Sequence, residues 1–538
     1  MSNLRISGLA SGMDTDAMVQ SLMKVERLKV SRYEQSRQVA LWRQEAYNNM
    51  NKMFASFILN TKKDMGLTKI TSTGLSFGNS YSNLDYIRKA TSSNETAATV
   101  SSTSKAVNGS FSLEVEELAK GATIVDDGIN EETLKDIKDI EIKLSIGETE
   151  KTMVIDKSKV SNMNDLVKQI NSYKDENGKS IEVTSFYDKE NKKLFLQTSE
   201  TGDKVELMLS YDKEGSDYKC VNNQKGNDAK VLYNGVELKY SSNRFELNGL
   251  NIELKAQGIT NIKVDTNVDG IMEKIEKLIN DYNELVDKSS KALNEKRYSK
   301  YQPLSQEEKK AMHEDDVKLW EEKAKSGMLN SDAIIQRALQ DARVDIYRTV
   351  ENAKGSFNHI TQIGISTEKY ARGTTGGKLQ IDKEKLREAI EKDPEAVMEL
   401  LFTEPEKVKR SDYPEGDEGS RLYEAAERKN RRDNGGIFTR VYDNLMDGMK
   451  SIIDKSGPGE DAELFRSVKS NILIDFVTKK SSISDLDKEV LDADRKIDDL
   501  NVMLYRKENA YYAKFANMEK MLHQMNSQSN WLTQQLMR

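Results

Sequence analysis

The sequence predicts an α+β multidomain protein. Long N- and C-terminal coiled-coil helices pair with a helical body, and β-rich head domains are inserted between them. Apolar residues recur at helical spacing near both ends of the chain and alternate with polar residues in the middle. All five prolines lie between Pro303 and Pro458, so both ends are free of this helix breaker. At 538 residues, the chain is also too long for one hydrophobic core.

These changes of spacing divide the chain into five parts. We expect, in order, an N-terminal flexible tail with a coiled-coil helix, a helical leg domain, a first β-rich head domain, a second head domain, and a C-terminal coiled-coil helix with a flexible tail. Their residues are 1–60; 61–95 with 266–480; 96–125 with 228–265; 126–227; and 481–538.

The C-terminal part carries a heptad pattern in which apolar residues follow alternating steps of three and four. The phase slips after Leu504, so we expect the helix to unwind locally near Lys507 and Glu508. A second stripe near the N-terminus can supply the opposing face. The predicted contact residues are Val39, Trp42, Ala46, Met53 and Phe57 in the N-terminal stripe, and Ile483, Leu486, Val490, Ile497, Leu500 and Leu504 in the C-terminal stripe. They fit either the core of an ordinary helical bundle or contacts between chains.

The middle of the chain has the alternating spacing of β-strands. In SFSLEVEEL, Phe111, Leu113 and Val115 fall on one face, and polar residues fall on the other. The predicted strands of the second head domain cover 140–146, 151–155, 181–187, 193–198 and 205–209, with a helix over 162–172. Helical spacing returns at Val268, so the β region is an insertion into a helical body.

Composition and charge exclude several kinds of partner. Charged residues make up 32% of the chain with a net charge of -7, and both signs are mixed, which argues against nucleic acid. Cys220 is the single cysteine, so an internal disulfide is excluded. No apolar run reaches the roughly 18–20 residues of a membrane span, so we expect no membrane insertion. The N-terminus MSNLRISGLASGMD lacks the apolar core of a secretory signal.

Catalytic and metal-binding patterns are also missing from the sequence. His313, His359 and His523 are far apart, and none has the spacing of metal ligands. No pair of carboxylates stands in an apolar setting that would raise its pKa. We therefore expect no catalytic residues, no metal, no cofactor and no enzymatic activity.

Five segments, in chain order over nearly the full length, resemble the family of flagellar filament capping proteins, also called hook-associated protein 2. These segments are LASGMDTDAMVQSLMKVE, GSFSLEVEELAKGA, YQPLSQEEKKAMHEDDVKLWEEKAKSGMLNSD, IGISTEKYARGTTGGKLQIDKEKLREAI and QMNSQSNWLTQQL. The resemblance is weakest from about Asp126 to Asn227, where it covers a strand-strand-helix-strand-strand pattern rather than particular residues.

The resemblance implies a structural cap and assembly chaperone at the distal tip of the bacterial flagellum. Copies of the chain would form a homo-oligomeric ring that promotes the folding and insertion of exported flagellin and prevents its loss. The implied location is extracellular, reached by flagellar type III export without a cleavable signal, and a flagellar export chaperone is a further expected partner. Two alternatives remain, namely a hook-filament junction protein and a tip adhesin whose head binds host mucin or glycan.

The last residues of the chain are candidates for docking on flagellin or the filament end. Polar residues from Asn526 to Asn530 interrupt the apolar spacing, so we expect this tail to be mobile alone and ordered by a partner. Together with the resemblance, this pattern predicts docking through Met518, Leu522, Met525, Trp531, Leu532 and Leu536.

Overall fold

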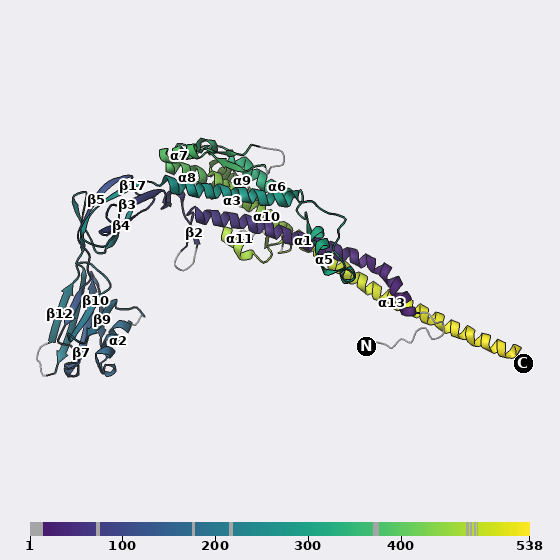
Figure 1. Ribbon diagram of the computed structural model, residues 1–538, viewed down its shortest axis with the longest axis horizontal. Coiled ribbons are helices and arrows are strands. Elements are labelled where there is room, and N and C mark those ends of the chain that lie inside the picture. The colour runs from purple at the N-terminus through teal and green to yellow at the C-terminus, as the bar shows by residue number, and fades with distance from the viewer. Residues whose placement is uncertain are drawn as a thin grey trace. The chain divides into compact units, whose positions relative to one another are not determined.

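The computed structural model describes residues 14–70, 76–174, 178–214, 219–369, 376–469, 473, 476–477, 480 and 482–537. The chain folds into two compact units (Figure 1). The helical unit comprises Met1–Gly78, Lys274–Ala389 and Ala396–Arg538, and the β-rich unit comprises Asn79–Glu273 and Ile390–Glu395. Long helices at both ends of the chain, with strands between them, confirm the predicted fold class.

Two helices run through most of the helical unit. They are α1 (Thr15–Asp64) and α13 (Asp485–Leu536). Asp14 caps α1 by accepting a hydrogen bond from the amide of Ala17, and Ser484 and Asp487 form a capping box at the start of α13. The other helices are α3 (Val268–Asn294), α4 (Gln306–Ala311), α5 (Glu314–Lys325), α6 (Ala333–Ile346), α7 (Lys383–Lys392), α8 (Pro394–Phe402), α9 (Asp417–Asn434), α10 (Ile437–Ser456) and α11 (Ala462–Val468). The unit also contains two short antiparallel strand pairs. They are β1 (Thr68–Ile70) with β2 (Ser76–Gly78), and β18 (Ile365–Thr367) with β19 (Leu379–Ile381).

The core of the helical unit forms where α1, α6 and α10 meet. Phe54 of α1 is fully buried there, and Gly448 of α10 allows the helices to approach closely. A Cβ atom on Gly448 would lie 2.6 Å from the Cβ of Ala338 on α6 and 3.5 Å from the Phe54 ring. Because 2.6 Å between two carbon atoms is far below van der Waals contact, a side chain at position 448 would push α10 and α6 apart.

The β-rich unit consists of antiparallel sheets. The five-stranded sheet has the order β14-β13-β5-β17-β3, a four-stranded sheet has the order β12-β11-β7-β8, and three-stranded sheets have the orders β6-β10-β9 and β15-β16-β4. The strands are β3 (Arg88–Ser92), β4 (Ala98–Ser102), β5 (Gly109–Glu117), β6 (Thr123–Asp126), β7 (Ile137–Ile146), β8 (Thr149–Val154), β9 (Val183–Asp188), β10 (Lys193–Thr198), β11 (Val205–Lys213), β12 (Lys219–Lys225), β13 (Ala229–Tyr233), β14 (Val236–Tyr240), β15 (Arg244–Leu247), β16 (Leu250–Leu254) and β17 (Gly258–Thr266).

Two hydrophobic clusters hold these sheets together. One joins the sheets that contain β7 and β10 and includes side chains of α2 (Met163–Ser172), such as Leu166. The other joins the sheets that contain β5 and β16, with Leu113 and Ile252 at its centre. Alternation along these strands places apolar side chains toward the clusters and polar side chains outward.

Candidate assembly surface of the terminal helices

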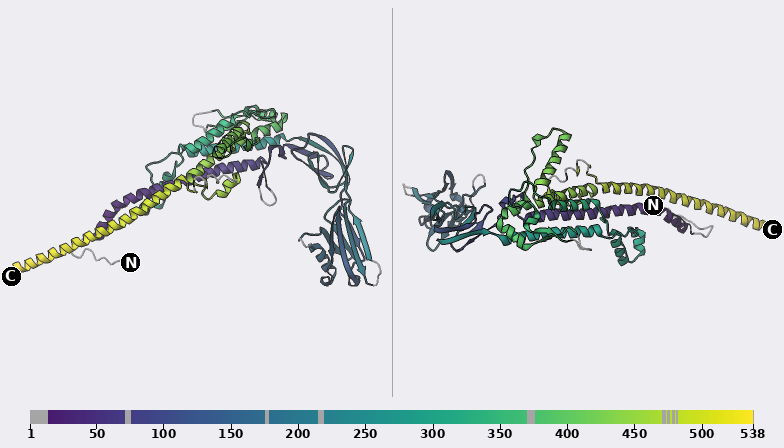
Figure 2. Two further views of the ribbon diagram at one scale, coloured as in Figure 1. Left: turned by 180° about the vertical axis from the view of Figure 1, so that it is seen from behind. Right: turned by 90° about the horizontal axis from the view of Figure 1, so that it is seen from above.

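The two terminal helices lie side by side and run in opposite directions (Figure 2). Three polar contacts fix their register. Lys507 Nζ lies 2.7 Å from the Glu26 carboxylate, Arg37 Nε lies 2.6 Å from Asp494 Oδ1, and the Gln44 amide donates to Asp487 Oδ1 at 2.7 Å. Early residues of α1 therefore face late residues of α13. The ammonium groups of Lys507 and Lys29 hold the pKa of Glu26 below its ordinary value.

An apolar seam accompanies these polar contacts. Val19, Met23 and Val30 of α1 are buried against Leu504 of α13. Half-buried neighbours on α13 extend the cluster, and they are Ile497, Leu500, Tyr511, Tyr512 and Phe515. Apolar packing between two antiparallel helices holds the pair together, because isolated helices gain little from propensity alone.

The far end of α13 extends beyond its partner. In this register, Thr15 at the start of α1 lies opposite about residue 517. Helix α13 continues to Leu536, and no described residue of α1 lies opposite this last part. We call residues 518–537 the overhang; it forms the yellow end of the helix in Figure 2.

The overhang exposes large apolar side chains in the heptad phase that Tyr511 and Phe515 begin in the seam. Met518 and Leu522 are half-buried, whereas Met525 is 62% exposed, Leu532 53% and Leu536 84%. These residues continue the steps of four and three that begin at Tyr511, with Ser529 at the one polar position. The polar residues from Asn526 to Asn530 therefore leave the helix and its phase intact. Trp531, also exposed, lies next to this stripe.

The predicted N-terminal stripe lies on a different face of α1. Trp42 is buried against Ala324 and Met328, and Val39 and Ala46 belong to the same cluster. Arg37 and Gln44, which face α13, are seven residues apart, so the intervening Val39 and Trp42 point away from it. The expectation that this stripe supplies the face opposite α13 is therefore wrong for Val39, Trp42 and Ala46.

The rest of that stripe belongs to the body of the helical unit. Phe57 packs between the rings of Tyr282 and Tyr442, with ring centroids 6.4 Å and 6.0 Å away, and Met53 is half-buried. The stripe residues near the start of α13 differ widely in burial: Leu486 is fully buried, Val490 is half-buried, and Ile483, which precedes the helix, is exposed.

The predicted unwinding near Lys507 and Glu508 is wrong. Helix α13 is continuous from Asp485 to Leu536. At this level Lys507 faces α1 and pairs with Glu26. The sequence did not predict the face of α1 that packs on α13, because Glu26, Arg37 and Gln44 occupy heptad positions of that face and interrupt its apolar pattern.

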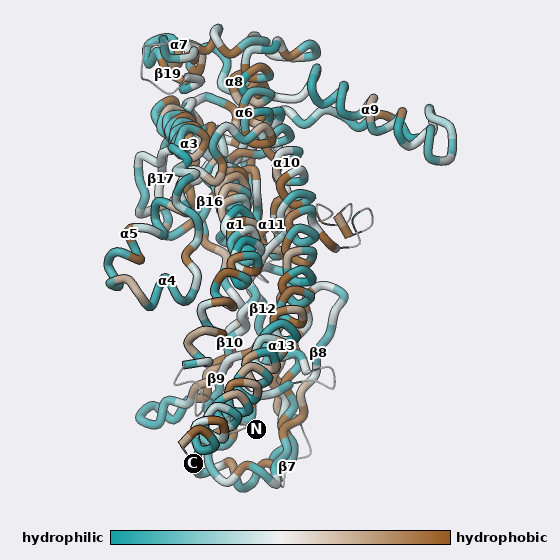
Figure 3. The backbone as a smooth tube through the Cα atoms, turned by 90° about the vertical axis from the view of Figure 1, so that its right-hand side faces the viewer, coloured by the Kyte–Doolittle hydropathy of each residue, from teal (hydrophilic) through white to brown (hydrophobic). Residues whose placement is uncertain are grey.

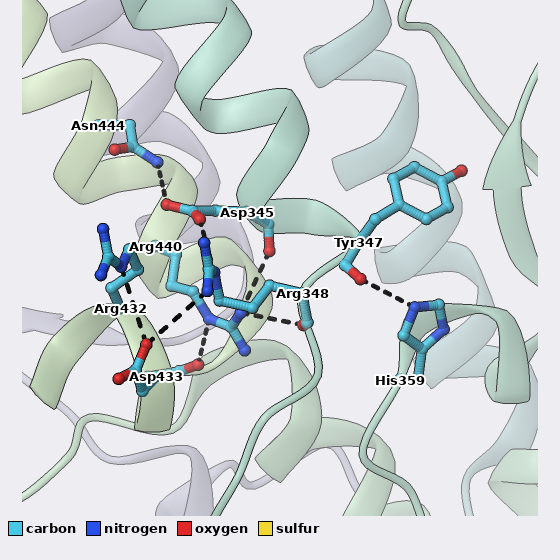
Figure 4. A network of polar contacts seen from close by, with 9 residues as sticks. Asp345, Tyr347, Arg348, His359, Arg432, Asp433, Arg440 and Asn444 are labelled. Atoms are coloured by element: carbon cyan, nitrogen blue, oxygen red, sulfur yellow. Dashed lines mark hydrogen bonds and ion pairs between the residues drawn. The ribbon is translucent and has the colours of Figure 1, made fainter. Parts of the chain in front are cut away.

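A buried polar network anchors the body from which the terminal helices extend (Figure 4). The guanidinium of Arg440, at the start of α10, donates to the carbonyl oxygens of Gly435 at 2.7 Å and Arg348 at 2.9 Å. Asp345, in the last turn of α6, accepts from Arg348 at 3.1 Å and from Asn444 at 2.9 Å. Burial lowers the pKa of Arg440 to about 10, so this side chain stays charged at neutral pH. The network fixes the end of α6 against α10.

Three histidines lie among the described residues. The two ring nitrogens of His359 hydrogen-bond with the Thr361 hydroxyl and the Tyr347 carbonyl, whereas His313 and His523 are exposed. Within the described ranges, no group of three or more His, Cys, Asp or Glu side chains is placed to hold a metal ion. No helix among the described residues is long and apolar enough to cross a membrane.

Comparison with known proteins identifies the family. A sequence model described as the flagellar hook-associated protein 2 C-terminus matches residues 226–527, and one for the N-terminus matches residues 11–122. The chain belongs to the flagellar hook-associated protein 2 family. This is a structural family of the flagellum and is not known for enzymatic activity. The residues between 122 and 226, which include most of the cluster around β7 and β10, lie outside both matches.

Individual relatives agree with this assignment. The flagellar hook-associated protein 2 of Halalkalibacterium halodurans is 27% identical over 98% of both chains. The protein of the same name from Thermotoga maritima is 23% identical over 56% of this chain and 40% of its own length. The crystal structure of the D1-D2-D3 domains of the flagellar cap protein FliD from Escherichia coli has a similar fold, with a TM-score of 0.50, 19% identity, and coverage of 75% of this chain and 95% of that one.

Proposed function

We propose that this chain is a structural cap and assembly chaperone at the distal tip of the flagellum. Copies form a ring, with the β-rich head domains, residues 96–125 with 228–265 and residues 126–227, as a plate above the filament end. Flagellin exported through the channel folds beneath the plate and is inserted, and the cap prevents its loss. The chain reaches this extracellular place by type III export, with a flagellar export chaperone as a partner before export.

The overhang of α13 carries this proposal. A cap has to hold the filament end and still move after each subunit, so its grip has to consist of contacts that break and re-form. A helix with an apolar stripe and few charges offers such a grip, since Glu519 and Lys520 are the charged residues between 518 and 537. Without charge pairs to fix one register, the stripe can re-pair at equivalent positions.

Removal of the tail tests the proposal. Truncation after Met525 is expected to shorten filaments and increase flagellin in the medium, because Trp531, Leu532 and Leu536 are lost from the docking stripe. A full-length variant with these three residues changed to Ser is expected to behave in the same way. A matched variant with Gln528, Gln534 and Gln535 changed to Ser is expected to grow normal filaments. Normal filament length after truncation would refute docking by the tail.

Labelling of intact flagella separates the cap from the junction protein. Immunogold with antibody against the β-rich unit is expected only at the distal tip. Label at the hook would indicate a junction protein, and label along the shaft would indicate a flagellin variant. Either result would refute the proposed cap function.

A tip adhesin is a second candidate function, supported by one feature of the β-rich unit. Phe186 of β9 and Phe195 of β10 stack on the outer face of their sheet, with centroids 4.4 Å apart and planes 6° apart, and Val125 of β6 lies beside them. Phe186 is exposed and Phe195 is half-buried, and exposed aromatic rings flanked by polar side chains, here Thr184 and Gln197, can stack on sugar rings. Binding of the full chain to mucin, lost in Phe186→Ser with Phe195→Ser, would support this function; equal binding by both proteins would refute it.

A further inference from the structure

We propose that the arm formed by residues 403–434 binds the knob formed by residues 305–326 of a second copy of this chain. The arm contains α9, and the knob contains α4 and α5. This proposal rests on the proposed ring and names a surface through which neighbouring copies meet.

The arm projects from the helical unit and has almost no core of its own. Of the residues of α9, all of which the structure describes, only Gly419 is buried. The helix is held by contacts with the part of the arm that precedes it, residues 403–416. The amide of Val408 donates to the Glu427 carboxylate at 2.9 Å, and Arg410 lies over the Tyr423 ring, 5.5 Å from its centroid. A helix with so little buried surface gains little from its own chain, which indicates a second partner.

The base of the arm is fixed to the body. Arg431 pairs with Asp443 of α10 through two bonds, at 2.6 Å and 3.0 Å, and with Glu404 at 2.9 Å. These two carboxylates raise the pKa of Arg431 against the opposing effect of its burial. The arm therefore keeps its direction, and its outer face is presented rather than folded back.

The outer face of the arm is basic around an exposed leucine. Arg421, Arg428, Lys429 and Arg432 lie on the solvent side of α9. The exposed acids of the helix are Glu424 and, in its first turn, Asp417 and Glu418, so the positive charge gathers in its second half. In the part of the chain that the structure describes, Arg421, Arg428 and Lys429 form no ion pair. Leu422 stands beside them and is 50% exposed.

The knob offers the opposite charge around a second exposed leucine. The first turn of α5 holds Glu314, Asp315 and Asp316, and Leu319, which follows them, is 58% exposed. Glu314 and Asp315 share Lys318, whereas Asp316 and Glu322 form no ion pair with a described residue. A contact between the two faces would bury both leucines and pair free charges of opposite sign.

The knob, like the arm, has a fixed position. Ala324 and Met328 pack on Trp42 of α1, and the Trp320 indole donates to the Gln302 carbonyl at 2.8 Å. Arm and knob project from opposite sides of the helical unit (Figures 2 and 3), so the arm of a molecule turns away from its own knob. Two different patches on opposite flanks make a head-to-tail contact, which produces a closed ring when the rotation between neighbours closes.

Charge reversal in the full chain tests the contact, with sedimentation velocity over a concentration series as the measurement. The arm variant is Arg421→Glu with Arg428→Glu, and the knob variant is Asp316→Lys with Glu322→Lys. Each variant alone places like charges together, so we expect its dissociation constant to rise by at least about tenfold. Combining all four changes in one chain restores opposite charges, and we expect assembly to return.

Two controls complete the experiment. Lys255→Glu with Lys291→Glu makes the same change of net charge at exposed sites outside the arm and knob, and we expect it to assemble like wild type. Circular dichroism is expected to be equal for all variants. An arm variant that assembles like wild type, or a combined variant that stays dissociated, would overturn the arm–knob contact alone. Wild-type protein that stays monomeric throughout would overturn the ring itself.

Discussion

Leu504 tests whether α1 and α13 are held together by their apolar seam. It is 7% exposed and packs against Val19, Met23 and Val30. Leu→Ala changes in protein cores cost about 2–5 kcal/mol. The low end applies here because the neighbouring Ile497 and Leu500 are only half-buried, so the gap can collapse or fill with water. We therefore expect Leu504→Ala to weaken the pair by about 2 kcal/mol.

This change acts locally, so hydrogen exchange measured by mass spectrometry is the suitable assay. A loss of about 2 kcal/mol corresponds to roughly 30-fold faster opening. Faster exchange is expected in peptides from residues 15–30 and 497–515 and not in peptides from α10. Val502, two residues away, is 53% exposed, so Val502→Ala serves as the matched control. Equal exchange in the two variants would show that the seam does not hold the pair.

Two further predictions concern the core of the helical unit. Asn51 is fully buried and neither polar atom of its amide has a hydrogen-bond partner, so Asn51→Leu is expected to raise stability by about 1–3 kcal/mol. Calorimetry should show a higher melting temperature for it than for Asn60→Leu, an exposed position on the same helix; a lower one would mean that the amide is satisfied. Gly448→Ala is expected to cost about 1–3 kcal/mol in thermal unfolding, and adding Ala338→Gly should recover part of it. Unchanged stability would refute the close helix approach.

The sequence predicts the elements better than the contacts between them. The strand expected over 193–198 is β10, and the strand expected over 140–146 forms the main part of β7. Strand β12 escaped prediction because it is an edge strand whose side chains are exposed on both faces, so they do not alternate. Periodicity reports burial, and a strand with no buried face leaves no period to detect.

The same limit explains the outcome at the terminal helices. The apolar stripe of the overhang is visible in the sequence because each residue follows the heptad of its own helix. The surface that packs against that helix cannot be read in the same way, because it depends on contacts between residues hundreds of positions apart. Both apolar stripes of α1 have helical spacing, and the one built on Trp42 is the longer and larger. Only the folded chain reveals that Trp42 is covered by Ala324 and Met328, which leaves Val19, Met23 and Val30 for α13.

Burial along α13 is greatest near its start and least at its end. Leu486 is fully buried near α10, Leu504 is buried against α1 alone, and Leu536 is 84% exposed. Because local stability follows buried apolar area, resistance to opening has to fall in the same order. One continuous helix therefore joins a buried start to an exposed end. Substitutions near Leu486 are therefore expected to lower the stability of the whole helix, whereas substitutions beyond Met518 are expected to leave that stability unchanged.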